Sequence, residues 1–180
     1  DECGSAGMGT AFKLNKDGTG YTLLHEFTGT NGDGGWVVAG PVMASDGAVY
    51  GTTATVGNTN QGTLFKLNPD GTGYQVLTSF QGNVPLNDGR GGEGRLVQGS
   101  DGALYGTTSN GGSAGAGAVF SLAEDGSGYA LLHSFARSDG DGHTPGGLVG
   151  GRDGALYGTT YSGGSAGSGT VFSLREDGSG

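Results

Sequence analysis

The stretch DGALYGTTSNGGSAGAGAVFSL, residues 101–122, decides the fold, because the chain repeats it almost unchanged as DGALYGTTYSGGSAGSGTVFSL at residues 153–174. The same pattern surrounds four phenylalanines, which recur at intervals of 53, 55 and 52 residues. These are Phe12, Phe65, Phe120 and Phe172. A period of about fifty residues is typical of solenoids and propellers, in which each unit packs against its neighbours.

One period contains four short runs that are rich in β-branched, aromatic and leucine side chains and are bounded by turn residues. In the third copy these runs are residues 94–100, 103–108, 118–122 and 129–135. Such runs predict strands, and no window of eleven or more residues has a helical period. We therefore expect four strands per period and no helix.

Asp-Gly pairs mark the points where the chain reverses. Between the first two runs, Asp101-Gly102 predicts a type I′ turn, because both residues accept positive φ values. Between the last two runs, Asp125-Gly126 is followed by Gly128, which predicts a longer loop with a bulge. Reversals of this kind join antiparallel neighbours.

The predicted fold class is all-β, with tandem four-stranded antiparallel blades in a β-propeller-like arrangement and about three and a quarter repeats. We expect one domain over residues 1–180. Its repeat units are expected at 1–35 (partial), 36–91, 92–145 and 146–180 (partial). Because propellers typically have about four to eight blades, the chain is expected to belong to a longer array or to be completed by another copy of itself.

The recurrent aromatic side chains are the predicted core. Besides the four phenylalanines, the tyrosines of the repeated YGTT motif are expected to pack between blades, since a single sheet cannot bury both faces. These are Tyr50, Tyr105 and Tyr157. In the fourth run, alternation predicts that Tyr129, Leu131, His133 and Phe135 share one face.

Composition excludes several classes of partner. The net charge is −9 with eight lysines and arginines, so nucleic acid is not an expected partner. No apolar run approaches the length of a membrane span, so membrane insertion is not expected. Cys3 is the single cysteine, so no internal disulfide can form, and its thiol is expected to be free or paired with another chain.

The combination of LYGTT, GTVF and LLHSF, with LVQGSDG upstream, resembles the tandem repeat of the bacterial choice-of-anchor GloVer-containing proteins. The likeness covers essentially the whole chain. It implies secreted or surface-exposed proteins with C-terminal anchors, propeller-like repeats and no assigned activity. The first copy departs from the pattern with Trp36 and the stretch VVAGPVM, and the second has Thr78 where others have His25 and His133.

Aspartates between the predicted blades suggest calcium as the one candidate cofactor. Asp139 and Asp141 in DGDG resemble part of a calcium loop, in which oxygen ligands recur at alternate positions. The matching connections supply further oxygen ligands, namely Asn31, Asp33, Asn87, Asp88 and Glu93. Gly-Asp-Gly is also ordinary turn chemistry, so removal of calcium with EDTA is the test that separates the two interpretations.

No catalytic motif stands out, and we expect that the protein is not an enzyme. Glu26 has no partner carboxylate at a suggestive spacing. His25 and His133 are expected to be hydrogen-bonded structural residues, because Thr78 replaces them in another copy. His143 is expected in a loop.

The expected function is a non-catalytic structural or adhesive role outside the cell or on its surface. Unpaired strand edges recruit strands from other chains, so assembly into filaments with other copies or further repeats is expected. The alternative is carbohydrate binding at the blade rims. Trp36 and Tyr161 are the candidate ligand contacts for that alternative, because aromatic side chains commonly line ligand sites.

Overall fold

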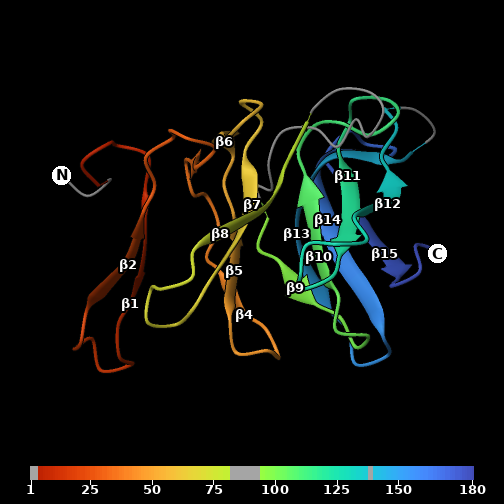
Figure 1. Cartoon of the computed structure of the whole chain (residues 1–180). Helices are drawn as coiled ribbons and strands as arrows, with labels where there is room; N and C mark the ends of the chain where they lie inside the picture. Colours follow the sequence, from red (N-terminus) through yellow and green to blue (C-terminus); the bar gives the residue numbers. More distant parts are fainter. Residues whose placement is uncertain (1–3, 82–93, 138–139) are drawn as a thin grey trace.

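The computed structural model describes residues 4–81, 94–137 and 140–180 (Figure 1). Over these ranges, fifteen strands form five sheets whose strand pairs are antiparallel, and no helix is present. The all-β antiparallel prediction is therefore confirmed. It follows that, in the described part of the chain, no helix is long and apolar enough to cross a membrane.

Four main sheets follow one another along the chain. The first contains β1 (Thr10–Lys13) and β2 (Thr22–Glu26). The second contains β4 (Val42–Met43), β5 (Val49–Thr52), β7 (Thr63–Leu67) and β8 (Gln75–Ser79). The third contains β9 (Val97–Gln98), β10 (Leu104–Thr108), β11 (Ala118–Leu122) and β12 (Ala130–Ser134). The fourth contains β13 (Gly142–Gly150), β14 (Ala155–Gly163) and β15 (Val171–Arg175). A small fifth sheet pairs β3 (Gly34–Gly35) with β6 (Thr55–Val56).

The second and third sheets are meanders, in which spatial neighbours are also successive strands of the same sheet. Figure 1 shows the main sheets side by side, with β1 and β2 at the left and β15 at the right. Apolar side chains form three clusters, one at each junction between consecutive sheets. The core is therefore built between sheets, as expected for repeats that cannot bury both faces alone.

The turns between the first two strands of a sheet differ from the predicted type I′ turn. Gly102 has a positive φ of 86°, but Asp101 does not belong to the residues with positive φ. The amide of Gly102 donates to the carbonyl of Gly99 at 3.2 Å, and the amide of Gly99 donates to the carbonyl of Ala103 at 2.9 Å. This is a three-residue loop that ends in a left-handed glycine. The Asp101 side chain instead accepts a hydrogen bond from the Ala103 amide.

The glycine of the YGTT motif is required by its cross-strand partner. Gly106 pairs with Phe120 across β10 and β11, and a Cβ at Gly106 would lie 2.5 Å from Phe120 Cζ. Gly51 stands in the same relation to Phe65, at the same 2.5 Å. The phenylalanine ring therefore lies over the glycine backbone, which explains why both residues recur together.

Each pairing between the last two strands of the first three sheets contains a β-bulge next to the recurrent phenylalanine. In the third sheet the register shifts between Val119 and Phe120. The alternation predicted for the fourth run is accordingly wrong at its end. Tyr129 and Leu131 pack against the cluster between the second and third sheets, whereas Phe135 is buried in the next cluster. The extra residue of the bulge is Leu132, so the alternation changes after Leu131, and the His133 ring lies 4.7 Å from the Phe135 ring between centroids.

The predicted core is correct in its middle and wrong at its two ends. Tyr50, Phe65, Tyr105 and Phe120 are buried, and Phe172 is half-buried. In contrast, Phe12 is 50% exposed and Tyr157 is 37% exposed. The physical reason is that burial of these side chains requires an adjacent sheet to cover them. Phe12 lies on the outward side of the first sheet, and Tyr157 lies on the outward side of the fourth.

Candidate functional site

The repeated feature with the clearest chemistry is the junction between consecutive sheets. We call the side of a sheet that is turned toward the next sheet along the chain its leading face, and the opposite side its trailing face. At the second junction, Phe80 of the leading face contacts Phe120 of the trailing face, with ring centroids 5.5 Å apart. Tyr129 stacks on the same Phe120 ring at 5.5 Å.

The same aromatic contact occurs at the other two junctions. Phe27 contacts Phe65 at 5.0 Å, and Phe135 contacts Phe172 at 5.0 Å. Aromatic pairs in tilted or edge-on geometry add about 0.5–1.5 kcal/mol to the apolar area that they bury. At each internal junction, the recurrent phenylalanine is thus covered by a second phenylalanine from the preceding sheet.

Polar contacts accompany the aromatic pair at one edge of the junction. The Tyr50 hydroxyl donates to the Asp46 carboxylate at 2.7 Å and lies 3.0 Å from the Glu124 carbonyl oxygen of the next sheet. Burial raises the pKa of Asp46, but hydrogen bonds from Lys66, from the Ala48 amide and from Tyr50 outweigh it and bring the pKa to about 2. Burial, together with the hydrogen bond to Asp46, raises the pKa of Tyr50 to about 12.

The next junction repeats these contacts. The Tyr105 hydroxyl donates to Asp101 at 2.8 Å and lies 3.4 Å from the Glu176 carbonyl oxygen. Burial, with the nearby Asp101 carboxylate, raises the Tyr105 pKa above its ordinary value. Tyr157 donates to Asp153 at 2.6 Å in the same way. The tyrosine of each YGTT motif is therefore fixed by its own Asp-Gly turn and, at the internal junctions, contacts the neighbouring sheet.

Two turns meet at this edge. The opening turn joins the first two strands of a sheet, and the closing turn joins the last two. The opening turns are residues 44–48, 99–103 and 151–155, and the closing turns are 15–19, 68–72, 123–127 and 175–179. All seven are closed by a hydrogen bond from the amide of the first residue to the carbonyl of the fifth. Positions within them can therefore be compared directly.

Glutamates of the closing turns bind the opening turn of the preceding sheet. The Glu124 side chain accepts a hydrogen bond from the Ser45 hydroxyl at 3.2 Å and from Gln98 Nε2 at 2.7 Å. The Glu176 side chain accepts from the Ser100 amide at 2.6 Å and from the Ser100 hydroxyl at 2.8 Å. Sequence reasoning missed both glutamates. Each glutamate stands directly before an Asp-Gly pair, and this position could have identified it. A polar residue is common in any turn, so the position did not point to a contact with another sheet.

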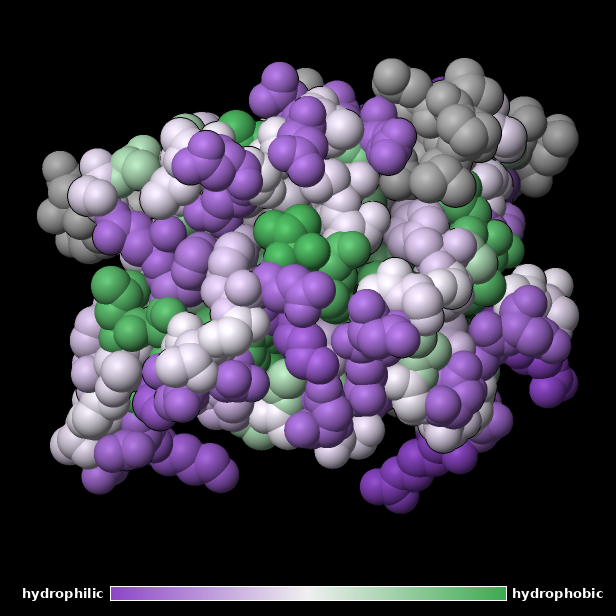
Figure 2. Space-filling model, in the orientation of Figure 1, coloured by the Kyte–Doolittle hydropathy of each residue, from purple (hydrophilic) through white to green (hydrophobic). Residues whose placement is uncertain are grey.

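The two end faces expose the counterparts of the internal junction residues. On the trailing face of the first sheet these are Phe12, Leu14, Tyr21 and Leu23. On the leading face of the fourth sheet they are Val149, Tyr157 and Val171. Figure 2, in the orientation of Figure 1, shows an apolar patch over the region of β1 and β2. Patches of this kind on an otherwise polar surface mark interaction sites.

A histidine, an aspartate and a tyrosine form a compact cluster at the first junction. The His25 ring stacks on Tyr74, with centroids 3.6 Å apart, and its Nε2 lies 3.4 Å from Asp33 Oδ1. Tyr74 donates to the same oxygen at 2.6 Å, and the Thr28 amide donates to the other at 2.8 Å. Burial raises the Asp33 pKa, but these hydrogen bonds outweigh it and lower the pKa.

This geometry bears on the predicted calcium ligands. Asp33 receives hydrogen bonds on both carboxylate oxygens, as described above. The Asp141 carboxylate accepts hydrogen bonds from the Ala136 amide at 2.9 Å and from the Gly142 amide at 3.0 Å. His133 Nε2 lies 3.5 Å from Asp141 Oδ2. Within the described ranges, no group of three or more His, Cys, Asp or Glu side chains is placed to hold a metal. Four of the predicted ligands, Asn87, Asp88, Glu93 and Asp139, lie outside the described residues, so calcium stays a prediction.

The two candidate aromatic contacts lie apart from each other in the fold. Trp36 is 62% exposed and has a left-handed φ of 58°, which is uncommon for a residue other than glycine. Tyr161, on β14, is 83% exposed and borders a hollow of about 470 Å³ beside Thr144 and Pro145. Thr144 has a left-handed φ of 56° and, like Trp36, bonds through its amide to a loop carbonyl of another sheet.

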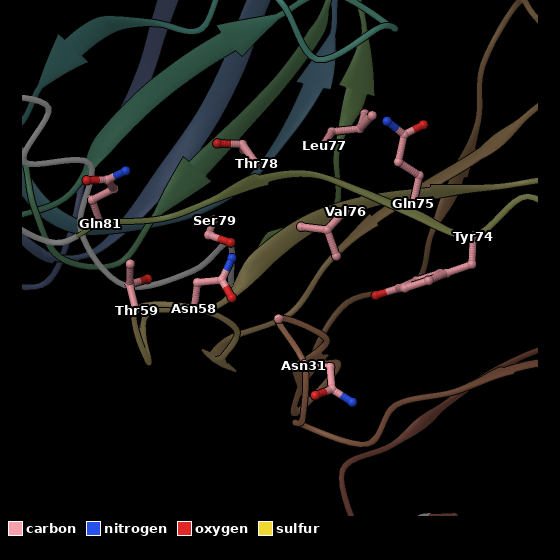
Figure 3. A pocket seen from close by; sticks show the side chains of 11 residues that line it. Asn31, Asn58, Thr59, Tyr74, Gln75, Val76, Leu77, Thr78, Ser79 and Gln81 are labelled. Atoms are coloured by element: carbon pink, nitrogen blue, oxygen red, sulfur yellow. The ribbon is translucent and has the colours of Figure 1, made fainter.

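A larger hollow, of about 590 Å³, lies along β8. Figure 3 shows Asn58, Thr59 and Ser79 at one end of it and Tyr74 and Gln75 at the other. None of its described lining residues is charged. Sequence reasoning did not identify this groove, because the connection 57–61 that borders it contacts β8 only through the tertiary fold.

Comparison with solved structures finds similarity in fold to several proteins. The chain matches a nidogen/laminin complex with a TM-score of 0.60 at 13% identity, covering 93% of this chain and 52% of that one. It matches a gluconolactonase-like protein with a TM-score of 0.56 at 17% identity, covering 84% and 48%. A protein of unknown function from Dyadobacter fermentans gives a TM-score of 0.52 at 12% identity, covering 91% and 54%. The chain therefore spans about half the length of each of these three proteins.

Comparison with curated proteins finds no match. A comparison with family models does give one, the Gloeobacter/Verrucomicrobia repeat, and its match extends over residues 1–180. The match therefore includes all of the repeated glycine–phenylalanine pairs, Asp-Gly turns and inter-sheet tyrosines described above. The chain belongs to the Gloeobacter/Verrucomicrobia repeat family.

Proposed function

We propose that the chain is a non-catalytic structural repeat module whose end faces stack against further repeats of the same kind in a β-propeller-like array. The observation that carries the proposal is the exposure of Phe12 and Tyr157 at the two ends, where their counterparts inside the molecule are covered. Burying such side chains is favourable by about 25 cal/mol for each Å² of apolar surface removed from water.

Two further observations support this function. Each junction buries a phenylalanine pair in the same way, and Phe12 on the trailing face of the first sheet presents the same ring to one more sheet. The four-stranded meander is the unit from which propeller blades are made. The proposal also includes a location outside the cell or on its surface and an adhesive role, because the repeat resembles that of surface-exposed proteins.

An extended chain tests the proposal. Gly180 corresponds to Gly128 in the repeat, so a copy of residues 129–180 appended after Gly180 continues the period in phase. This extension supplies a fourth strand for the last sheet and most of a further sheet. We expect the Tyr157 ring to become protected from hydroxyl-radical oxidation and the melting temperature to rise, because stability grows with each added repeat interface.

Tyr21 is the internal control in the same experiment. It lies on the trailing face of the first sheet and is not covered by a C-terminal extension, so its oxidation rate should stay unchanged. If Tyr157 is oxidised as fast in the extended chain as in the original chain, the leading face does not receive a further repeat and the proposal is wrong.

Carbohydrate binding is a second candidate, and the groove along β8 is the observation that favours it. Amide and hydroxyl side chains without charge suit the hydroxyl groups of a neutral sugar, since pockets use a few placed polar groups to fix orientation. A glycan array should then show binding that Asn58→Ala and Gln75→Ala weaken. Asn15→Ala, in a closing turn of the first sheet, is the matched control. Absence of binding to every glycan, or equal binding by all variants, would remove this candidate.

A further inference from the structure

The charged side chains at the two ends of the stack do not match each other, and this has a consequence for assembly. At the second and third junctions, the second residue of the opening turn is Ser45 or Ser100, and it contacts Glu124 or Glu176 at the second position of the closing turn. In the last opening turn this position is Arg152, and in the first closing turn it is Lys16.

We propose that this pair of positions selects the neighbour of each end face, an inference that rests on the proposed stacking function. The face that carries Arg152 accepts a repeat with an acidic residue at the second position of its closing turn. It rejects a second copy of this chain, because head-to-tail stacking of two copies brings Arg152 against Lys16.

At the seam, by which we mean the edge of a junction where an opening turn meets a closing turn, some groups are constant and others vary from copy to copy. The aspartate of the opening turn is constant, since Asp46, Asp101 and Asp153 each accept a hydrogen bond from the tyrosine of their own sheet. The apolar contacts are also shared by the junctions. Constant groups contribute equally to every pairing and cannot distinguish one neighbour from another.

The variable groups can distinguish neighbours. Arginine presents a planar fork of donors that binds a carboxylate through two hydrogen bonds, which suits a glutamate in the place of Glu124 or Glu176. Two cations in the same place repel each other, and like charges across an interface are a common means of rejecting a wrong partner. The apolar faces can thus pack against any repeat, whereas the charged residues at the second positions of the two turns favour some neighbours and disfavour others.

Charge reversal at either position tests this inference in the full chain. Lys16→Glu places a carboxylate against Arg152 of the next copy, and Arg152→Glu places a carboxylate against Lys16, so both variants convert repulsion into attraction. Sedimentation equilibrium in about 50 mM salt should show head-to-tail association of each single variant that is roughly 2- to 30-fold tighter than that of the original chain. At about 0.5 M salt the difference should shrink, because exposed charges are screened.

The double variant Lys16→Glu/Arg152→Glu is the decisive control, because it restores like charges. Its association should return to the level of the original chain. Arg95→Glu makes the same change in net charge outside both end turns and should leave association unchanged. The inference is overturned if neither single variant associates more tightly than the original chain, or if the double variant associates as tightly as the single ones.

These outcomes are distinct from failure of the stacking proposal itself. Protection of Tyr157 in the extended chain reports whether a further repeat packs on the leading face. If the extension protects Tyr157 but charge reversal has no effect on association, the stacking function holds and only the selective role of Arg152 and Lys16 is wrong.

Discussion

Two threonines in equivalent positions have different hydrogen-bonding environments, which permits a sharp test of the packing. Thr53 Oγ1 accepts a hydrogen bond from the Thr63 amide at 2.9 Å and lies 3.0 Å from the Thr63 hydroxyl, and both residues are fully buried. In the third sheet, Thr108 occupies the place of Thr53, but Ala118 occupies the place of Thr63. The Thr108 hydroxyl is buried and has no hydrogen-bond partner within the described residues.

The substitution of valine for threonine keeps the shape and removes the hydroxyl. Thr53→Val leaves the Thr63 amide and hydroxyl buried without their partner, which should lower the free energy of unfolding by about 1–3 kcal/mol. Thr108→Val breaks no hydrogen bond and removes an unsatisfied polar group, so its effect should lie between zero and a gain of about 1 kcal/mol. Thr160→Val should behave like Thr53→Val, since Thr160 Oγ1 accepts from the Thr170 amide at 2.9 Å.

Urea unfolding of the three variants measures these differences. The midpoint should fall for Thr53→Val and Thr160→Val and should stay or rise for Thr108→Val, at an unchanged slope. In a chain of this length, 1 kcal/mol corresponds to roughly 2–4 °C in melting temperature. The reasoning is refuted if Thr108→Val loses as much stability as Thr53→Val, because the loss would then come from side-chain packing and not from the hydrogen bond.

Three further predictions concern the aromatic junctions, the glycines and the acid stability. Phe120→Ala should lower the free energy of unfolding by about 3–5 kcal/mol, whereas Phe12→Ala, in the half-exposed counterpart, should lower it by less than half as much in the same urea titration. Gly106→Ala should cost about 1–3 kcal/mol, because the added Cβ meets Phe120 and Leu96, while Gly40→Ala, with no heavy atom within 4 Å of its Cβ, should be neutral. Asp46 has a folded-state pKa of about 2, below its ordinary value of 3.8, so its contribution to stability is complete above about pH 4 and is lost as the pH falls toward 2. Asp46→Asn should therefore flatten the decline of melting temperature between pH 4 and 2, and an unchanged decline would contradict this assignment.

The strands were predictable from the sequence because their signals are local. The run 118–122 became β11 (Ala118–Leu122) with the predicted bounds, and 129–135 became β12 (Ala130–Ser134). Each is bounded by Asp-Gly or glycine-rich turns that act over a few residues. The Asp-Gly pair predicted the position of the turn correctly but its type wrongly. Asp-Gly permits several loops, and the choice of a three-residue loop is made by hydrogen bonds within the hairpin.

The candidate sites were less predictable, because their partners lie far apart in the sequence. Tyr105 contacts the Glu176 carbonyl, and Tyr50 contacts the Glu124 carbonyl, in each case across more than seventy residues. No pattern within one repeat contains both members of such a pair. The exposure of Phe12 could not be predicted for the same reason. The sequence around Phe12 resembles that around Phe65, but Phe65 is covered by the preceding sheet and Phe12 is not.

A stack of repeats that relied on its apolar faces alone would have no defined order. The hydrophobic effect is not directional and depends mainly on the area buried, so any leading face would accept any trailing face. The aromatic pairs at the three junctions are nearly equivalent and carry no information about position. In the proposed stacking of separate chains, order then comes from positions at which the copies differ. Ser45, Ser100 and Arg152 on one side of the seam, and Lys16, Pro69, Glu124 and Glu176 on the other, are such positions. Because they lie at the edge of each junction, they can change from copy to copy without disturbing the core that every copy shares.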